Sequence, residues 1–286
     1  MKVALLVLLA FFCTVSLHAN VAVCPAAHDT SLDAGDVNNS DGGGPAFFVG
    51  TDGDDETHRA LISFDLSSIP AGSTITNVQL VLTLSNVAGG GGGGGGTEPS
   101  NATISLYALT RSWGEGTSES DALGVNGTGH GAPASAGDAT WDAAMFDETN
   151  GLWANPGGDF NSTASGSLFL NGNMVNTAFT WLSTPQMVAD VQGWLNNSAT
   201  NYGWILINAD ETDPRTLYGF YSRTWSTFPG AQGQANFEPA LQVTFTPPGV
   251  PVPPWASWAG LAAVAFVSLR ALRRNGSSRE ASFPLS

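Results

Sequence analysis

The chain of 286 residues is strongly acidic, with nine Lys and Arg against 24 Asp and Glu and a net charge of −15. Between residues 20 and 247 the imbalance is larger, because 23 acidic residues face four Arg and no Lys, which gives a charge of −19. Such a surface repels nucleic acid, anionic lipid and polyanionic glycans, and it favours either divalent cations or a solubility role in a salty environment.

The N-terminus is predicted to be a secretory signal peptide that covers residues 1–22. Lys2 supplies one positive charge, and residues 3–15 form an apolar stretch of the length that is typical of such signals. This stretch is shorter than the roughly 20 residues that a membrane-spanning helix needs. Ala19 and Ala22 are the candidate cleavage positions, and an N-terminal anchor that is never cleaved is the alternative.

Residues 23–246 are predicted to form one all-β domain. Apolar and polar residues alternate at 60–66 and at 78–84, as expected of strands with one face in a core. A Pro-Ala-Gly turn at residues 70–72 lies between these two segments. Because Cys24 is the single cysteine of this region, packing rather than a disulfide must stabilise it. Four further strands are expected at residues 103–108, 167–170, 204–207 and 240–246.

One short helix is predicted to begin at Pro185, a residue well suited to the first helical position. Ser183 or Thr184 can cap it, and an Asn-Asn pair at residues 196–197 ends it. Five apolar residues recur at helical spacing and therefore share one face. They are Met187, Val188, Val191, Trp194 and Leu195. Trp194 is accordingly expected to be a core anchor rather than a platform for a ligand.

Two regions are low in complexity. Residues 89–96 are eight consecutive glycines, which do not open a helix and are expected to be a flexible loop insert rather than a phosphate cradle. Residues 118–173 are rich in small and polar side chains. They are expected to form a long, partly ordered excursion, and such segments are either functional or disordered.

An acidic loop offers a candidate calcium site. Asp33, Asp36, Asn38 and Asp41 place several hard oxygen atoms close together in the sequence, and calcium takes six to eight such ligands. The spacing is not that of an EF-hand, so a solvated turn is the alternative. A second acidic turn, residues 51–56, has the same two interpretations.

The sequence does not indicate catalysis. Three histidines, at positions 28, 58 and 130, lack the spacing of a contiguous metal motif such as H-x-x-x-H, and no G-x-S-x-G motif occurs. Glu115, Asp121 and Asp190 could supply a glycosidase pair, which needs two carboxylates about 5–10 Å apart across a cleft. Asp190 is expected at the surface of the capped helix, so we predict that the chain is not an enzyme.

A glycan ligand would need exposed aromatic rings beside polar side chains. The candidates are Trp113, Trp153, Tyr218, Tyr221, Trp225 and Arg223. Each ring could instead be buried, because aromatic side chains dominate buried area. The arginine could instead pair with an acidic neighbour.

Several motifs, taken in order, resemble those of DNRLRE-domain proteins. Residues 59–70 read RALISFDLSSIP and resemble the opening signature of that family, and residues 113–116 resemble its W-x-E-G. Residues 188–203 resemble V-x-x-W followed by N-[YF]-G, residues 222–223 resemble the late S-R-E, and residues 239–243 resemble the closing P-x-L-x-V. The likeness covers nearly all of residues 29–246.

The DNRLRE family is related to the carbohydrate-binding modules of family 96, some of which bind alginate. The resemblance implies a jelly-roll-like antiparallel β-sandwich that has no known catalysis of its own. The chain departs from the family at Thr224, which stands where Glu follows Ser-Arg in family members. This departure argues against transferring a ligand-binding role from the family to Arg223.

The last forty residues predict delivery to the cell exterior. A proline-rich linker covers residues 247–254, an apolar segment with a basic end covers 255–274, and a short tail covers 275–286. The arrangement resembles the PEP-CTERM sorting tags of exosortase systems in Gram-negative bacteria, which a sorting protease removes. A single-pass membrane anchor is the alternative, although the 18 residues from 255 to 272 barely suffice to span a bilayer.

These observations predict an exported, surface-displayed β-sandwich with one short helix that binds rather than converts its ligand. Polysaccharide is the expected partner, with Ca²⁺ as a candidate cofactor and nucleic acid excluded. A structural or adhesive extracellular protein without a small ligand is the first alternative. A polysaccharide-degrading enzyme is the second.

Overall fold

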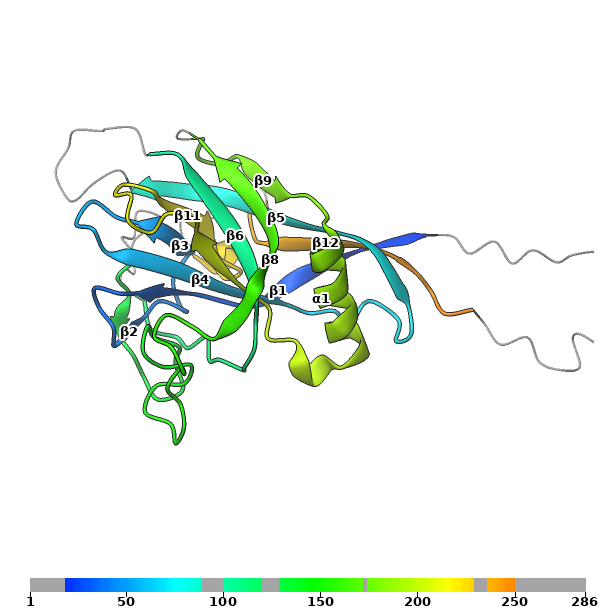
Figure 1. The fold of residues 1–286 in the computed structure, drawn as a ribbon, viewed down its shortest axis with the longest axis horizontal. Coiled ribbons are helices and arrows are strands. Elements are labelled where there is room, and N and C mark those ends of the chain that lie inside the picture. The colour runs from blue at the N-terminus through cyan, green and yellow to red at the C-terminus, as the bar shows by residue number, and fades with distance from the viewer. Residues whose placement is uncertain (1–18, 89–99, 120–128, 172–173, 229–235, 250–286) are drawn as a thin grey trace, which may run out of the picture. The chain divides into compact units, whose positions relative to one another are not determined.

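The structure is a computed structural model that describes residues 19–88, 100–119, 129–171, 174–228 and 236–249. Nearly all of its regular elements are β-strands (Figure 1). The strands are β1 (Asn20–Asp33), β2 (Asn39–Ser40), β3 (Ala46–Thr51), β4 (Thr57–Phe64), β5 (Thr74–Ala88), β6 (Ala102–Leu109), β7 (Ala132–Pro133), β8 (Phe160–Leu170), β9 (Ala178–Trp181), β10 (Trp204–Asn208), β11 (Leu217–Tyr221) and β12 (Ala240–Thr246). The helices are α1 (Pro185–Asn196) and the single 3₁₀ turns η1 (Ser198–Thr200) and η2 (Trp225–Thr227).

All the strand pairings are antiparallel, and the main sheet follows the order β1-β12-β5-β11-β3-β4-β10-β6-β8, with β9 also paired to β5. This path returns on itself because β1 pairs twice. The first half of β1 pairs with β12, where Asn20 is opposite Phe245. The second half of β1 pairs with β4, where Asp33 is opposite His58. An irregularity near Ala26 separates the two halves, as a β-bulge does when a strand bends from one sheet to another. The predicted all-β, antiparallel fold is confirmed.

Several predicted strands match the structure closely, and six strands were not predicted, namely β1, β2, β3, β7, β9 and β11. β12 has the predicted bounds, whereas β5 and β8 extend well beyond the segments expected from alternation. β3 and β11 are buried at every residue, so they have no alternating pattern to detect. β9 is only four residues long, and β1 begins at Asn20, three residues before the predicted start of the domain.

The core contains several aromatic rings that touch one another. Trp204 is fully buried, and its ring lies edge-on to Trp194 and Phe64, with centroids 4.7 and 6.3 Å away. Trp194 is 5% exposed, which confirms that it is a core anchor. Asp190 does not lie free at the surface as expected. It is half-buried and accepts hydrogen bonds from the Trp204 Nε1 atom, at 2.9 Å, and from the Ser165 hydroxyl.

The helix α1 begins and ends where the sequence predicts. Thr184 is the N-cap, and its Oγ1 accepts the Met187 backbone N–H at 3.0 Å, while Pro185 occupies the first turn. The same hydroxyl donates to the Ser165 carbonyl in β8, so the cap also joins α1 to the sheet.

Replacing Thr184 with Ala is expected to lower the free energy of unfolding by about 1–2 kcal/mol, because the Met187 N–H loses its acceptor. Urea denaturation measures the change. Thr184→Ser keeps the oxygen and is the matched control, which should lose less than half as much. Equal losses in the two variants would contradict the capping role.

Some predicted features lie outside the described residues. These are most of the signal peptide, the glycine run at 89–96, the linker beyond Gly249, the apolar segment at 255–274 and the tail. Within the part of the chain that the structure describes, no helix is long and apolar enough to cross a membrane.

Candidate functional site

Most of the aromatic side chains predicted to bind a glycan are instead buried or hydrogen-bonded within the protein. Tyr218 is fully buried, and its hydroxyl donates to the Ser100 carbonyl at 3.2 Å. Tyr221 is 3% exposed and stacks on Phe237 with centroids 4.9 Å apart. Neither ring presents a face to a surface ligand. The prediction of these two residues as an exposed platform does not fit the structure, because their positions in β11 are buried on both sides of the sheet.

The other predicted aromatic residues are also engaged. Trp153 and Trp225 are buried, at 5% and 4% exposure. Trp113 is half-buried, and its Nε1 atom donates to the Tyr202 carbonyl at 2.8 Å. Its ring lies edge-on to His28, with centroids 6.0 Å apart. Of the predicted rings, only that of Trp113 keeps a partly open surface.

Arg223 forms an ion pair with the buried carboxylate of Glu115, while its own side chain is 36% exposed. Its guanidinium donates to both oxygens of Glu115, with Nε 2.6 Å from Oε1. The same carboxylate accepts the Asp29 backbone N–H at 2.8 Å and lies 3.3 Å from the His28 Nδ1 atom. Burial alone raises the pKa of Glu115. The hydrogen bonds from His28, Arg223 and the Asp29 backbone lower it by more than burial raises it, so the net shift of the pKa is downward. Arg223 therefore follows the alternative interpretation, pairing with an acidic neighbour.

Asp29 lies beneath this ion pair and is only 1% exposed. Its Oδ2 atom accepts the Arg223 backbone N–H at 2.8 Å. Burial is the main reason that its pKa rises to about 8, and the nearby charge of Glu115 adds to the effect. Asp29 is therefore mostly protonated at neutral pH.

The four residues of the predicted calcium site do not gather around one point. Asp33 and Asp36 approach His130, whose Nδ1 atom lies 2.8 Å from Asp33 Oδ2 and 3.9 Å from Asp36 Oδ2. Asp41 lies near Asp29 instead, where its charge contributes to the raised pKa of that group. The backbone carbonyl of Asn38 accepts the Ala134 N–H at 3.0 Å. The predicted oxygen ligands are therefore separated, with Asp33 and Asp36 near His130 and Asp41 near Asp29.

Five residues around His130 form what we call the acid–imidazole cluster: Asp33, Asp52, Glu56, His58 and His130. Asp33 ends β1, the two other carboxylates lie in or beside the turn between β3 and β4, His58 is in β4, and His130 precedes β7. His58 Nε2 lies 3.8 Å from Asp33 Oδ1 and 3.9 Å from Asp52 Oδ2. These residues lie far apart in the sequence, and neither histidine is near a second histidine in the chain, so the sequence pattern does not indicate the cluster.

The close approach of several carboxylates and a histidine shifts the pKa values of two residues in the acid–imidazole cluster. Burial raises the pKa of Asp52, but the neighbouring His58 ring and the backbone N–H groups of Glu56 and Asp54 lower it to about 2. Because 3.9 Å exceeds hydrogen-bond distance, the effect of His58 is electrostatic. Burial and then repulsion from Asp33 and Asp52 raise the pKa of Glu56.

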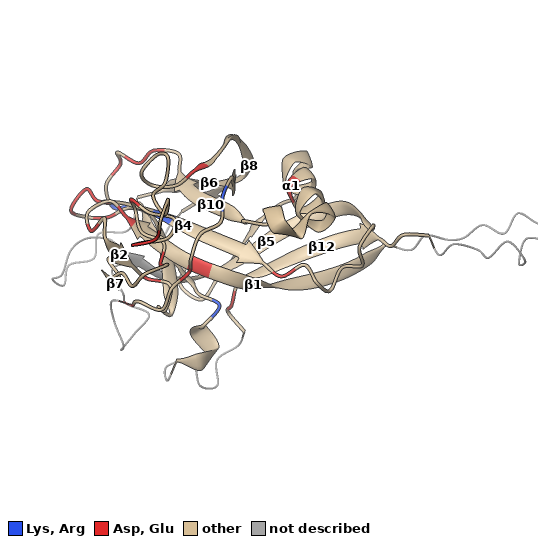
Figure 2. Cartoon of the chain, turned by 90° about the horizontal axis from the view of Figure 1, so that it is seen from below, with Lys and Arg blue, Asp and Glu red and all other residues tan. Residues whose placement is uncertain are grey.

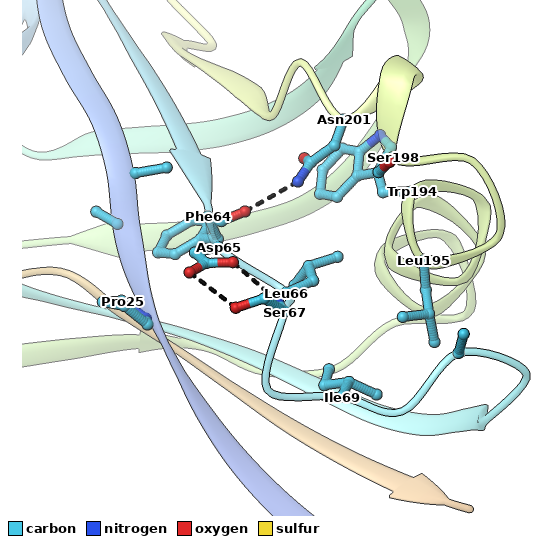
Figure 3. A pocket seen from close by; sticks show the side chains of 13 residues that line it. Pro25, Phe64, Asp65, Leu66, Ser67, Ile69, Trp194, Leu195, Ser198 and Asn201 are labelled. Carbon is cyan, nitrogen blue, oxygen red and sulfur yellow. Dashed lines mark hydrogen bonds between the residues drawn. The ribbon is translucent and has the colours of Figure 1, made fainter.

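A pocket of about 610 Å³ lies between β1, the turn after β4, and α1 with η1 (Figure 3). Its wall is largely apolar and includes Leu66, Ile69 and Leu195. Polar groups lie beside that wall. Asn201 donates from Nδ2 to the Phe64 carbonyl at 2.9 Å, while its Oδ1 atom is buried and has no hydrogen-bond partner in the described part of the chain. The Asp65 carboxylate accepts the Ser67 N–H and hydroxyl at 2.8 and 3.0 Å.

The carboxylates considered for catalysis are already engaged. Glu115 is paired with Arg223, and Asp190 is bonded to Trp204 and Ser165. Asp121 lies outside the described residues. The described members of this trio do not flank the pocket beside α1.

No protein-family model and no curated protein matches this chain. The resemblance to DNRLRE-domain proteins therefore stays a prediction from the motifs themselves.

Proposed function

We propose that this chain is an exported, non-catalytic binding module that takes a neutral glycan in the pocket beside α1. The observation that carries the proposal is the pocket itself, where an apolar wall adjoins the Asp65 carboxylate and the Oδ1 atom of Asn201, which has no partner among the described residues. Ligand pockets commonly combine mostly apolar linings of 300–1,000 Å³ with a few placed polar groups. A sugar ring offers both an apolar face and hydroxyl donors.

Charge favours a neutral glycan over an acidic one. The Asp65 carboxylate can only accept hydrogen bonds when it is ionised, and its hydrogen bonds with Ser67 lower its pKa. The net charge of −19 over residues 20–247 repels polyanions further. The proposed ligand therefore differs from the alginate that the family resemblance suggests.

The location and the finer fold belong to the same proposal. The motifs shared with DNRLRE-domain proteins support a jelly-roll-like sandwich, and the apolar N-terminus supports export. The proline-rich linker and the apolar segment at 255–274 support a sorting tag or a membrane anchor. In either case the pocket would work outside the cell.

Glycan-array binding by the full chain tests the proposed function. We expect saturable binding to one class of neutral glycan and an affinity about tenfold lower for Asp65→Asn, because one charge-assisted hydrogen bond is lost. The exposed Asp213 lies outside the pocket lining, so Asp213→Asn is the matched control and should bind as the natural chain does.

Three results would contradict this function. Absence of binding to every neutral glycan on the array would favour the structural or adhesive alternative. Release of reducing sugar would indicate an enzyme. Equal loss of affinity in Asp65→Asn and Asp213→Asn would place the glycan away from the pocket.

A further inference from the structure

We propose that the acid–imidazole cluster is a binding site for a first-row transition metal ion of the zinc class. Its ligands are the imidazoles of His58 and His130 and the carboxylates of Asp33 and Asp52, with Glu56 at the solvent side. This site is independent of the proposed glycan pocket, and either one can fail without the other.

His58 is the first observation. The residue is fully buried, and neither of its ring nitrogens has a hydrogen-bond partner among the residues that the structure describes. A buried polar group without a partner is costly and calls for an explanation. Its Nε2 atom faces Asp33 Oδ1 and Asp52 Oδ2 at 3.8 and 3.9 Å. These separations are too long for hydrogen bonds but suit two ligands of one ion.

His130 reaches the same space from a distant part of the chain. Its Nε2 atom lies 3.8 Å from Asp52 Oδ2, the oxygen that also faces His58. Its Nδ1 atom lies 2.8 Å from Asp33 Oδ2 and 3.5 Å from Glu56 Oε2. The two imidazole rings lie edge to face with centroids 5.5 Å apart. Two nitrogen donors and several carboxylates therefore converge.

The donor set selects the kind of metal. Calcium and magnesium take oxygen ligands, whereas imidazole suits zinc, copper, iron and nickel. Zinc bonds to nitrogen and oxygen at about 2.0–2.2 Å, so two of its ligands lie at most about 4.4 Å apart. The separations of 3.8–3.9 Å fall within this limit. Two groups of donor atoms share His130, one with Asp33 and His58 and one with Asp52 and Glu56, and the atoms of each lie within 4.8 Å of one another, slightly beyond the limit. A small closing movement of the exposed side chains would complete the coordination.

The two inner carboxylates are held in place by backbone groups. Asp52 Oδ1 accepts the N–H groups of Asp54 and Glu56, each at 2.9 Å, and Asp33 Oδ1 accepts the Gly35 N–H at 2.8 Å. Such outer contacts orient metal ligands and are a regular part of metal sites. The rigid half of the site is thus already formed.

The outer half of the cluster opens to solvent. The side chains of His130 and Glu56 are 30% and 37% exposed, in contrast to the closed position of His58. Figure 2 shows acidic residues gathered in the loops at this end of the domain, away from α1. A cation can therefore reach His58 by passing between the side chains of His130 and Glu56. A water molecule or other exchangeable ligand of the metal would enter and leave on this same side.

Titration calorimetry of the full chain, after treatment with a chelator, tests the site. We expect one Zn²⁺ ion per chain and an increase of the melting temperature on binding. His130→Gln should weaken Zn²⁺ binding at least tenfold without changing the circular dichroism spectrum, since that side chain is partly exposed. Cobalt substitution should give a visible absorption band and X-ray absorption that contains imidazole scattering.

His28→Gln is the matched control, because it removes an imidazole that lies beside Glu115, outside the acid–imidazole cluster. It should bind Zn²⁺ within twofold of the natural chain. Equal effects of His28→Gln and His130→Gln, absence of Zn²⁺ binding, or preference for Ca²⁺ over Zn²⁺ would each overturn the proposal. His58→Gln adds a test at the buried ligand only if that variant folds, so the conclusion depends on His130.

Discussion

Replacing Asp29 with Asn is expected to raise the free energy of unfolding at pH 8 by roughly 4–5 kcal/mol, an order-of-magnitude value. The physical reason is the burial that raises the pKa of Asp29 to about 8. In the unfolded chain the same group ionises near pH 4. Asparagine resembles the protonated carboxyl in shape, and its Oδ1 atom can still accept the Arg223 N–H.

The sign of the pH dependence follows from the same shift. Between about pH 4 and pH 8 the folded state holds a proton on Asp29 that the unfolded state has released, so stability falls as pH rises through this window. Below pH 4 both states are protonated and the contribution vanishes. Asp29→Asn should therefore remove the decline and leave stability at pH 4 unchanged.

Urea denaturation at pH 4, 6 and 8 measures this effect. Asp65→Asn is the matched control, because the carboxyl of Asp65 is exposed and its pKa is lowered rather than raised. That variant should show no gain at pH 8. If Asp29→Asn lost stability at pH 8, or kept the slope of the natural chain, Asp29 would not be a buried, protonated carboxyl.

Replacing Glu115 with Ala is expected to lower the free energy of unfolding by about 3 kcal/mol. The carboxylate is 7% exposed and accepts hydrogen bonds from the Arg223 guanidinium and the Asp29 backbone. Its removal leaves the buried Asp29 N–H without its acceptor, which costs about 1–3 kcal/mol. It also ends the ion pair with the partly exposed Arg223, which contributes about 1 kcal/mol or less. Thermal and urea denaturation at pH 7 measure the change.

Glu211 provides a matched comparison within the same chain. It forms a similar two-pronged pair with Arg59, at 2.7 and 2.8 Å, but its side chain is 26% exposed. Glu211→Ala should cost about 1 kcal/mol, because solvent screens the more exposed carboxylate of Glu211. A loss for Glu211→Ala that equals or exceeds that for Glu115→Ala would contradict the role assigned to burial.

Local signals in the sequence predicted much of the fold. The helix α1 was predicted with its cap at Ser183 or Thr184 and its core anchor at Trp194, because capping and the 3.6-residue period are properties of the segment itself. β12 was predicted with its bounds because one of its faces is buried and the other is not. β3 and β11 were missed because continuous burial erases the alternation that marks a strand.

The acid–imidazole cluster could not be predicted in the same way. Asp33 meets His58 because the second half of β1 pairs with β4 in the register that sets these two residues opposite each other. Register between distant strands depends on the whole core. The sequence did contain one usable signal, since the acidic turn at residues 51–56 is followed at once by Thr57 and His58.

The central claim is that the pocket beside α1 binds a neutral glycan. The most direct measurement is an NMR titration of the isotope-labelled full chain with a soluble oligosaccharide of the class selected on the array. We predict saturable amide shifts confined to the pocket lining, at Leu66, Ser67, Ser198 and Asn201. Shifts centred on Trp113 and Arg223, or none at saturating sugar, would contradict it.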